Sequence, residues 1–220
     1  MHDVSGATRR PMELKSTEFA VVDVETTGSG PNRGDRITEI AVVHVNDDVA
    51  TTVFEMLVNP QRPVSPFAAR LTGIHWAALH EAPTFGDVAD RLLEVIEGRV
   101  FVAHNVKFDW RMLSSEVERV TGQPLKGERL CTVKLARRLL PHLPRRNLDS
   151  LAWHYDVSII GRHRAGGDAR ATARILQCLL ADARRMDIDT WDDLATFMRL
   201  PRPRPKPSPM PQPVSVEAVA

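Results

Sequence analysis

Apolar positions along the chain recur with the two periods of regular secondary structure. Runs of apolar or alternating residues, typical of strands, occupy residues 19–24, 37–46, 51–59 and 99–104. Asp47 and Asp48 are turn-forming residues between the second and third of these runs. The first three runs follow one another without a helical segment between them, which predicts an antiparallel start to the sheet.

Apolar residues at helical spacing dominate most of the remaining chain. Helices are predicted over residues 83–98, 106–121, 133–140, 147–155, 167–185 and 190–198, with short helical pieces on either side of Gly73. Thr84 and Asp87 resemble a capping box, and Gly98 ends the helix that they begin. This order predicts an α/β fold with a mixed central sheet, three antiparallel strands and then parallel strands, flanked by helices.

Composition allows one sizeable core. The 220 residues are 43% hydrophobic and 26% charged, which is ordinary for a globular protein. We expect one domain over residues 17–198, preceded by a flexible leader at 1–16 and followed by a disordered tail at 199–220. Proline occupies every second position from 201 to 213, which excludes a helix and favours an extended chain. The tail is either a solubilising segment or an arm that docks a partner or phosphate.

Charge limits how a polyanion could be held. The formal net charge of the chain is +1, and the tail holds four basic residues and one acidic residue. The domain that precedes the tail is therefore weakly acidic, which argues against a large basic surface for nucleic acid.

Cysteine use and hydropathy bear on the compartment. Cys131 and Cys178 lie far apart and form no disulfide or zinc pattern, so we expect reduced thiols in a cytoplasmic protein. The N-terminal segment lacks the apolar core of a signal peptide, and no apolar run approaches the length of a membrane span. We expect no membrane partner.

Two carboxylates stand at the end of the first strand, one residue apart. Side chains alternate between the faces of a strand, so Asp23 and Glu25 point the same way and repel each other. One interpretation is a pair of solvated surface charges. The other is a site for a divalent cation, because carboxylates bind Mg²⁺ or Mn²⁺ and the bound cation removes the repulsion.

Two further segments carry candidate ligands. Asp109 lies at the start of a predicted helix, four residues after Asn105, and Asp168 opens the strongest predicted helix. Helix capping and the helix dipole alone could account for these three residues. His163 precedes Asp168 across a Gly-Gly pair, which we expect to let the backbone fold the histidine towards the carboxylate.

Three ordered motifs resemble those of a known enzyme family. DVETTG (23–28), HNVKFD (104–109) and HRAGGD (163–168) are similar to the motifs of the DEDDh family of 3′→5′ exonucleases. The likeness is nearest to the epsilon proofreading subunit of bacterial DNA polymerase III and its stand-alone relatives. LTGIH (71–75), APTFGDV (82–88) and RRNLDSLAWHY (145–155) extend the resemblance to about residues 17–183. The pair Gly166-Gly167 departs from the bulkier or acidic residues common in the family, which bears on the positioning of His163.

The resemblance implies an RNase H-like fold and the roles of five residues. The metal ligands for two divalent cations, Mg²⁺ or Mn²⁺, would be Asp23, Glu25, Asp109 and Asp168, and His163 would be the general base. The implied reaction hydrolyses phosphodiester bonds at the 3′ end of single-stranded or mispaired DNA and releases nucleoside 5′-monophosphates. A polymerase or another replication or repair protein is an expected partner.

Residues near these ligands are expected to contact the substrate. Glycine at position 28 would permit close approach of the backbone to a terminal nucleotide. Core packing is the alternative role for the two apolar members of the set. The expected substrate contacts are Thr26, Thr27, Gly28, Ile74, His104, Asn105 and Phe108.

Two rival functions stay open at this point. The first is an RNA-directed 3′→5′ exonuclease of the same superfamily, because the metal chemistry does not depend on the 2′-hydroxyl. The second is a non-catalytic nucleic-acid-binding or scaffold subunit with a lost active site. The presence of all five chemical residues argues against the second.

Overall fold

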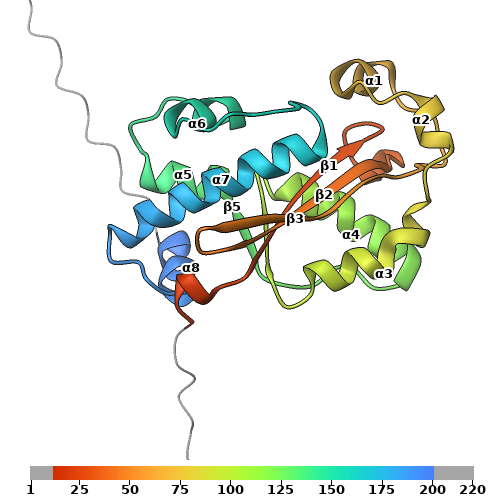
Figure 1. The fold of residues 1–220 in the computed structure, drawn as a ribbon. Helices are drawn as coiled ribbons and strands as arrows, with labels where there is room; N and C mark the ends of the chain where they lie inside the picture. The colour runs from red at the N-terminus through yellow and green to blue at the C-terminus, as the bar shows by residue number, and fades with distance from the viewer. Residues whose placement is uncertain (1–11, 201–220) are drawn as a thin grey trace, which may run out of the picture.

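The first three strands form an antiparallel unit within one five-stranded sheet. The computed structural model describes residues 12–200. Strand order is β3-β2-β1-β4-β5, with β1 antiparallel to β2 and parallel to β4, and β4 parallel to β5 (Figure 1). The strands are β1 (Phe19–Thr26), β2 (Ile37–Asn46), β3 (Val49–Leu57), β4 (Val100–Ala103) and β5 (Arg129–Cys131). The predicted mixed sheet is confirmed.

Helices form where apolar residues recur at helical spacing, within one or two residues of most predicted bounds. They are α1 (Pro66–Thr72), α2 (Trp76–His80), α3 (Phe85–Ile96), α4 (Lys107–Thr121), α5 (Thr132–Leu139), α6 (Leu148–His154), α7 (Ala165–Arg184) and α8 (Trp191–Arg199). Thr84 and Asp87 form the predicted capping box of α3. No helix within residues 12–200 has both the length and the apolar character that crossing a membrane requires.

Helices cover both faces of the sheet. Alternate residues of β1 divide between the two layers: Phe19 and Val21 pack with α5, α6, α7 and α8, whereas Ala20 and Val22 pack with α3 and α4 (Figure 1). Asp23 and Glu25 continue the first of these series, so they lie on the face that α7 covers. The sheet therefore fixes the side on which the two carboxylates emerge.

Strand β5 was not predicted. It has three residues, of which Leu130 and Cys131 are buried. Three residues are too few to show a period of two, and the strand exists because it pairs in parallel with β4.

The expected leader is partly incorporated into the fold. Leu14 is 1% exposed, and its N–H donates to the carbonyl of Asp189 at 2.7 Å. Glu13 forms an isolated antiparallel bridge with Thr190. The boundary that we expected at residue 17 is therefore too late, because this short segment packs against the connection that precedes α8. Residues 1–11, and the expected tail from residue 201 onwards, lie outside the described residues.

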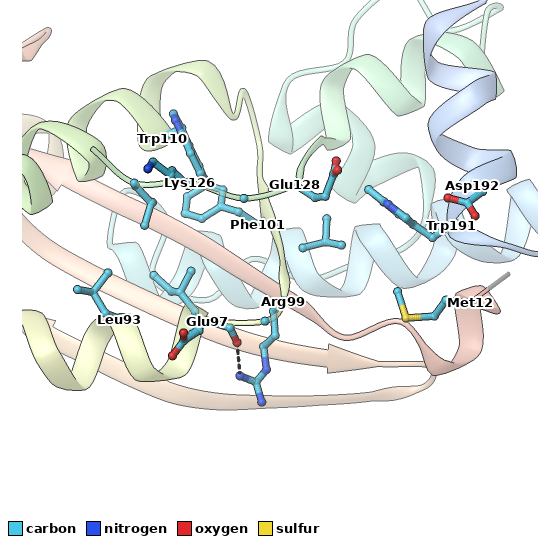
Figure 2. Close-up of a pocket in the computed structure, with 15 residues that line it drawn as sticks. Met12, Leu93, Glu97, Arg99, Phe101, Trp110, Lys126, Glu128, Trp191 and Asp192 are labelled. Atoms are coloured by element: carbon cyan, nitrogen blue, oxygen red, sulfur yellow. Dashed lines mark hydrogen bonds between the residues drawn. The ribbon is translucent and has the colours of Figure 1, made fainter. Parts of the chain in front are cut away.

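One cavity lies at the amino ends of β4 and β5. It has a volume of about 820 Å³, and its walls include the buried ring of Phe101 and the partly buried rings of Trp110 and Trp191 (Figure 2). None of the residues for which we expected a catalytic or substrate-binding role lines it. The candidate chemistry therefore lies elsewhere, at the carboxyl ends of the parallel strands.

Candidate active site

Three carboxylates from distant parts of the chain converge at the end of β1. Asp23 and Glu25 come from the strand, and Asp168 comes from the first turn of α7. One ligand oxygen from each lies within 4.8 Å of the others. Asp168 is buried, and the other two are partly buried. Asp23 and Glu25 therefore lie on one side of the strand, as predicted, and Asp168 lies beside them.

The fourth acid, Asp109, lies on α4 and is hydrogen-bonded to the backbone of the same strand. It is 4% exposed in the first turn of α4, and its Oδ1 accepts a hydrogen bond from the N–H of Val24 at 3.3 Å. Asp109 is not one of the three that meet within 4.8 Å, but its charge acts on Asp23. The site is therefore a tight group of three carboxylates with a fourth beside it.

Burial and mutual repulsion raise the pKa values of the cluster. Burial raises the pKa of Asp23 well above its ordinary value, and the charges of Asp109, Glu25 and Asp168 raise it further. Burial, followed by the charge of Asp168, raises the pKa of Glu25 to about 8. Burial also raises the pKa of Asp109 to about 7. Without added positive charge, the cluster therefore holds protons that ordinary carboxyl groups would have lost at neutral pH.

The donor set fits a hard divalent cation. All members of the cluster offer carboxylate oxygens, the ligands that Mg²⁺ and Mn²⁺ prefer. Asp168 Oδ1 is buried and has no hydrogen-bond partner among the described residues. A buried acceptor without a donor is costly, and a cation bound there would satisfy it.

A buried glutamate holds α7 in place beside the strand. Glu39 is opposite Glu25 in the β1–β2 pairing and is 2% exposed. Its carboxylate accepts from the Arg164 guanidinium, with the shortest contact at 2.6 Å, and from the N–H of Ala165 at 2.8 Å. This ties β2 to the first residue of α7, three residues before Asp168. Sequence reasoning missed Glu39, although a lone acid in the apolar run ITEIAVV was a usable signal.

His163 reaches the cluster by a different backbone route from the one we expected. Its φ angle is +62°, and Gly161 has a φ of +75°. Gly166 and Gly167 are instead helical residues of α7 with negative φ, so the expectation that they turn the backbone is wrong. His163 Nδ1 lies 3.2 Å from Nη1 of Arg162, whose guanidinium also contacts Asp168. The left-handed turn at 161–163 brings His163 and its neighbour to the metal-ligand candidate.

The glycine pair is explained by close packing. A Cβ at Gly167 would lie 2.1 Å from the carbonyl oxygen of Gly161 and 2.4 Å from that of Ile160, both backbone atoms. A Cβ at Gly166 would meet only the carboxylate of Glu55, whose side chain is 41% exposed. Position 167 therefore needs glycine for the approach of the 160–163 turn, whereas position 166 faces a side chain that can move.

We expect Gly167→Ala to lower the free energy of unfolding by about 1–3 kcal/mol, because helix and turn must separate. Gly166→Ala is the matched control and should stay within about 1 kcal/mol of the wild type, since the Glu55 side chain moves and alanine favours the helix. Urea unfolding of the two variants measures both values. Equal destabilisation would contradict the assignment of the close contact to position 167.

A groove adjoins the cluster. It has a volume of about 820 Å³ and extends from Glu25 to α1. Four of the residues expected to contact substrate line it, together with Phe67 and Leu71 of α1. These four are Thr26, Thr27, Gly28 and Phe108.

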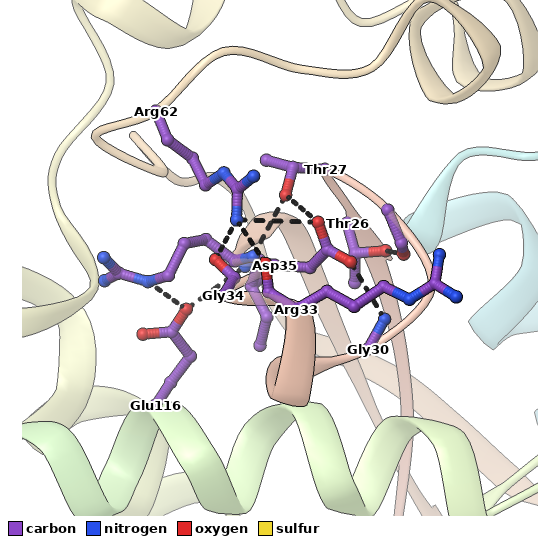
Figure 3. A network of polar contacts seen from close by, with 11 residues as sticks. Thr26, Thr27, Gly30, Arg33, Gly34, Asp35, Arg62 and Glu116 are labelled. Carbon is purple, nitrogen blue, oxygen red and sulfur yellow. Dashed lines mark hydrogen bonds and ion pairs between the residues drawn. The ribbon is translucent and has the colours of Figure 1, made fainter.

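A buried aspartate organises the loop beside this groove (Figure 3). Asp35 is 7% exposed and accepts from Thr27 Oγ1 at 3.1 Å and from the N–H of Gly30 at 3.1 Å. Arg62 Nη1 lies 3.6 Å from the same carboxylate. A Cβ at Gly28 would be 2.5 Å from Asp35 Oδ1, so glycine is required there by close approach. Asp35 was missed because its role depends on contacts that only the folded loop creates.

The remaining expected substrate contacts do not line the groove. Ile74 is 3% exposed, whereas Phe67 and Leu71 are exposed at 71% and 43%. The apolar side chains presented to a ligand are therefore those of α1, because the left-handed Gly73 ends that helix and Ile74 turns inward.

His104 and Asn105 follow β4 but are separated from the groove. His104 is partly buried, and its Nδ1 lies 2.9 Å from Thr132 Oγ1. Burial, followed by the charge of Arg162, lowers the pKa of His104 to about 4, so this ring is neutral at physiological pH. Asn105 is exposed with a φ of +75°, and its side chain does not cap α4 as the helix-capping interpretation required.

Comparisons with known proteins agree on one family. Residues 20–176 match the family RNase_T, described as exonuclease. The chain is 36% identical over 177 residues to a DNA polymerase III PolC-type protein from Caldanaerobacter subterraneus subsp. tengcongensis, covering 80% of the chain and 12% of the relative. It is 34% identical over 190 residues to a DNA polymerase III subunit epsilon-like protein from Rhodobacter capsulatus, covering 84% of the chain and 27% of the relative.

A solved structure gives the same result for the fold. Exonuclease X in complex with 5′ overhanging duplex DNA aligns with a TM-score of 0.66 and 29% identity, covering 82% of this chain and 99% of that one. The chain itself spans less than a third of the length of the two curated relatives. The shared part is thus the unit that carries the carboxylate cluster and the groove.

Proposed function

The chain belongs to the RNase_T exonuclease family, and on that premise we propose that it hydrolyses DNA from the 3′ end with the aid of divalent cations. The observation that supports this most directly is the meeting of Asp23, Glu25 and Asp168 within 4.8 Å beside an open groove. Repulsion within this group disfavours three bare charges, and bound Mg²⁺ or Mn²⁺ would remove it. Asp109 would complete the ligands for a second ion.

Each part of the site has a proposed role in phosphodiester hydrolysis. Asp23, Glu25, Asp109 and Asp168 would hold the two cations, which would supply positive charge to the phosphate and to the attacking water. His163 takes a proton from the attacking water as the water oxygen bonds to phosphorus. The bond from phosphorus to the 3′ oxygen of the preceding nucleotide breaks, and that oxygen takes a proton from solvent water. A nucleoside 5′-monophosphate leaves, and the strand ends in a new 3′-hydroxyl. The loop fixed by Asp35 would hold the terminal nucleotide along Thr26, Thr27 and Gly28.

Two features support DNA as the substrate and a polymerase as a partner. The chain is 29% identical to Exonuclease X, which was solved with 5′ overhanging duplex DNA. The names of the PolC-type and epsilon-like relatives refer to DNA polymerase III. We therefore propose a 3′ terminus, single-stranded or mispaired, as the substrate, and proofreading or repair beside a polymerase as the setting.

The test is digestion of labelled oligonucleotides by the purified 220-residue chain. Single-stranded, mispaired, 5′ overhanging and RNA versions of one sequence are compared with Mg²⁺ and with chelator. We expect 3′-labelled DNA to release labelled mononucleotide at once, 5′-labelled DNA to shorten stepwise, and chelator to stop both. Faster digestion of RNA than of DNA would identify RNA as the substrate. Activity in excess chelator would refute the metal-dependent mechanism.

A further inference from the structure

Arg162 connects the carboxylate cluster to an exposed aspartate, Asp149. Arg162 Nε lies 2.8 Å from Asp149 Oδ1 and Nη2 lies 3.3 Å from Asp149 Oδ2, which makes a forked ion pair. At its other edge, Nη1 donates to Asp168 Oδ2 and lies 3.2 Å from His163 Nδ1. The same nitrogen therefore contacts a candidate metal ligand and the candidate base.

The two ends of this bridge differ in burial. The Asp168 side chain is 8% exposed, that of Arg162 is 31% exposed, and that of Asp149 is 58% exposed. Within residues 12–200, Arg162 is the only basic side chain that forms an ion pair with any of the four clustered acids. Its charge opposes the rise in the pKa values of Asp23 and Glu25. Arg162 is thus the protein's own cation in the cluster.

A guanidinium and a metal ion make opposing demands on Asp168. Both use the lone pairs of its carboxylate, and a positive charge a few ångströms away repels an arriving dication. The contact with His163 has a second consequence. A guanidinium nitrogen can only donate, so Nδ1 of His163 accepts, and the proton of the neutral ring lies on Nε2. In this arrangement the imidazole has no free lone pair with which to act as a base.

We propose that Arg162 competes with metal ions for Asp168, and that its release from Asp168 also frees Nδ1 of His163. Metal binding by Asp168 and the availability of the lone pair on His163 Nδ1 are then coupled through the Arg162 side chain. Asp149 retains the outer edge of the guanidinium, so the arginine stays close to the site after the inner edge has been released. This inference rests on the proposed metal site and adds a positioning residue that the family motifs do not include.

Mn²⁺ binding to the 220-residue chain, measured by calorimetry or by the EPR signal of free Mn²⁺, tests the competition without nuclease activity. We expect Arg162→Gln to bind Mn²⁺ about tenfold more tightly than the wild type, since a repelling charge is removed. Arg162→Lys keeps the charge and should stay within about threefold of the wild type. Unchanged or weaker Mn²⁺ binding by Arg162→Gln, or equal tightening by Arg162→Lys, would overturn the proposal.

Arg170→Gln is the matched control. Arg170 lies two residues after Asp168 on α7, and its Nη1 pairs at 2.5 Å with Glu55, a carboxylate outside the cluster. The substitution removes the same unit of charge, and Mn²⁺ affinity should change by less than about twofold. If Mn²⁺ affinity rose equally in Arg162→Gln and Arg170→Gln, net charge alone would explain the rise, and the competition for Asp168 would be refuted. If neither the wild type nor any variant binds Mn²⁺, the metal site itself fails, an outcome distinct from failure of the competition alone.

The ¹⁵N resonances of the His163 ring test the second half of the proposal. With chelator present, the wild-type neutral ring should carry its proton on Nε2, and Arg162→Gln should shift the ring towards a mixture of tautomers. The resonances are assigned by their loss in His163→Ala. A wild-type ring protonated on Nδ1, or a tautomer unchanged in Arg162→Gln, would refute the link between Arg162 and the base.

Discussion

Asp23→Asn should lower the rate of 3′-end hydrolysis by at least about 10³-fold while leaving the protein folded. Asp23 belongs to the three-carboxylate group and is the member whose pKa is raised by all three other acids of the cluster, so it is central to any shared cation. Loss of such a ligand removes electrostatic stabilisation of the transition state, typically the largest contribution to catalysis. Single-turnover digestion of 3′-labelled DNA with saturating Mg²⁺ measures the effect.

Asp90→Asn is the control for this substitution. Asp90 is an exposed aspartate on α3, on the opposite face of the sheet from α7. The same chemical change there should leave the rate within about twofold of the wild type. If Asp23→Asn kept more than a tenth of wild-type activity, Asp23 would not be a metal ligand in the reaction.

Asp23→Asn should also make the protein more stable when chelator is present. Burial and repulsion raise the pKa values of Asp23 and Glu25, so the folded state keeps protons that the unfolded chain releases. Wild-type stability in chelator should therefore fall as the pH rises from about 4.5 to about 8. Asp23→Asn removes one charge, and its melting temperature at pH 8 should exceed that of the wild type by about 2–4 °C, equivalent to about 1 kcal/mol.

His163→Gln should lower the hydrolysis rate by about 10²–10⁴-fold, the usual contribution of a general base. The wild-type rate at saturating Mg²⁺ should rise with pH, because a general base must be unprotonated to accept a proton, and the variant should lack that rise. The requirement for Mg²⁺ should persist, because the carboxylate cluster is intact. Rate profiles between pH 5.5 and pH 9 separate the base from the metal ligands.

His142→Gln provides the matched comparison, since His142 is an exposed histidine that contacts His154. It should reproduce the wild-type profile. A His163→Gln variant with the wild-type rate and pH dependence would remove His163 from the mechanism and favour another proton acceptor.

Local patterns predicted the parts of the site that each lie within one segment. The period of two along β1 placed Asp23 and Glu25 on one side, and the capping box of Thr84 and Asp87 located the start of α3. Order along the chain, together with the family resemblance, grouped Asp168 with these acids, and the structure brings the three together. Their roles as metal ligands stay predictions.

What sequence patterns did not show depends on contacts between distant segments. Glu39 contacts Arg164 and Ala165 across 125 and 126 residues, and the burial that makes this clamp strong exists only after β2 and α7 have packed. No local pattern distinguishes Arg162 from other arginines of the chain, and only the folded turn at 161–163 brings it to Asp168. The error about Gly166 and Gly167 has the same origin, since the glycine requirement comes from the backbone of a neighbouring turn rather than from local conformation.

The bridge between Glu13 and Thr190 has a consequence for how this unit can be built into longer polypeptides. It brings the segment before β1 beside the residue that precedes α8, next to the start of β1 and away from the groove at the end of that strand (Figure 1). A domain joined ahead of residue 12 would therefore attach at the end of β1 opposite the groove and would leave the groove open.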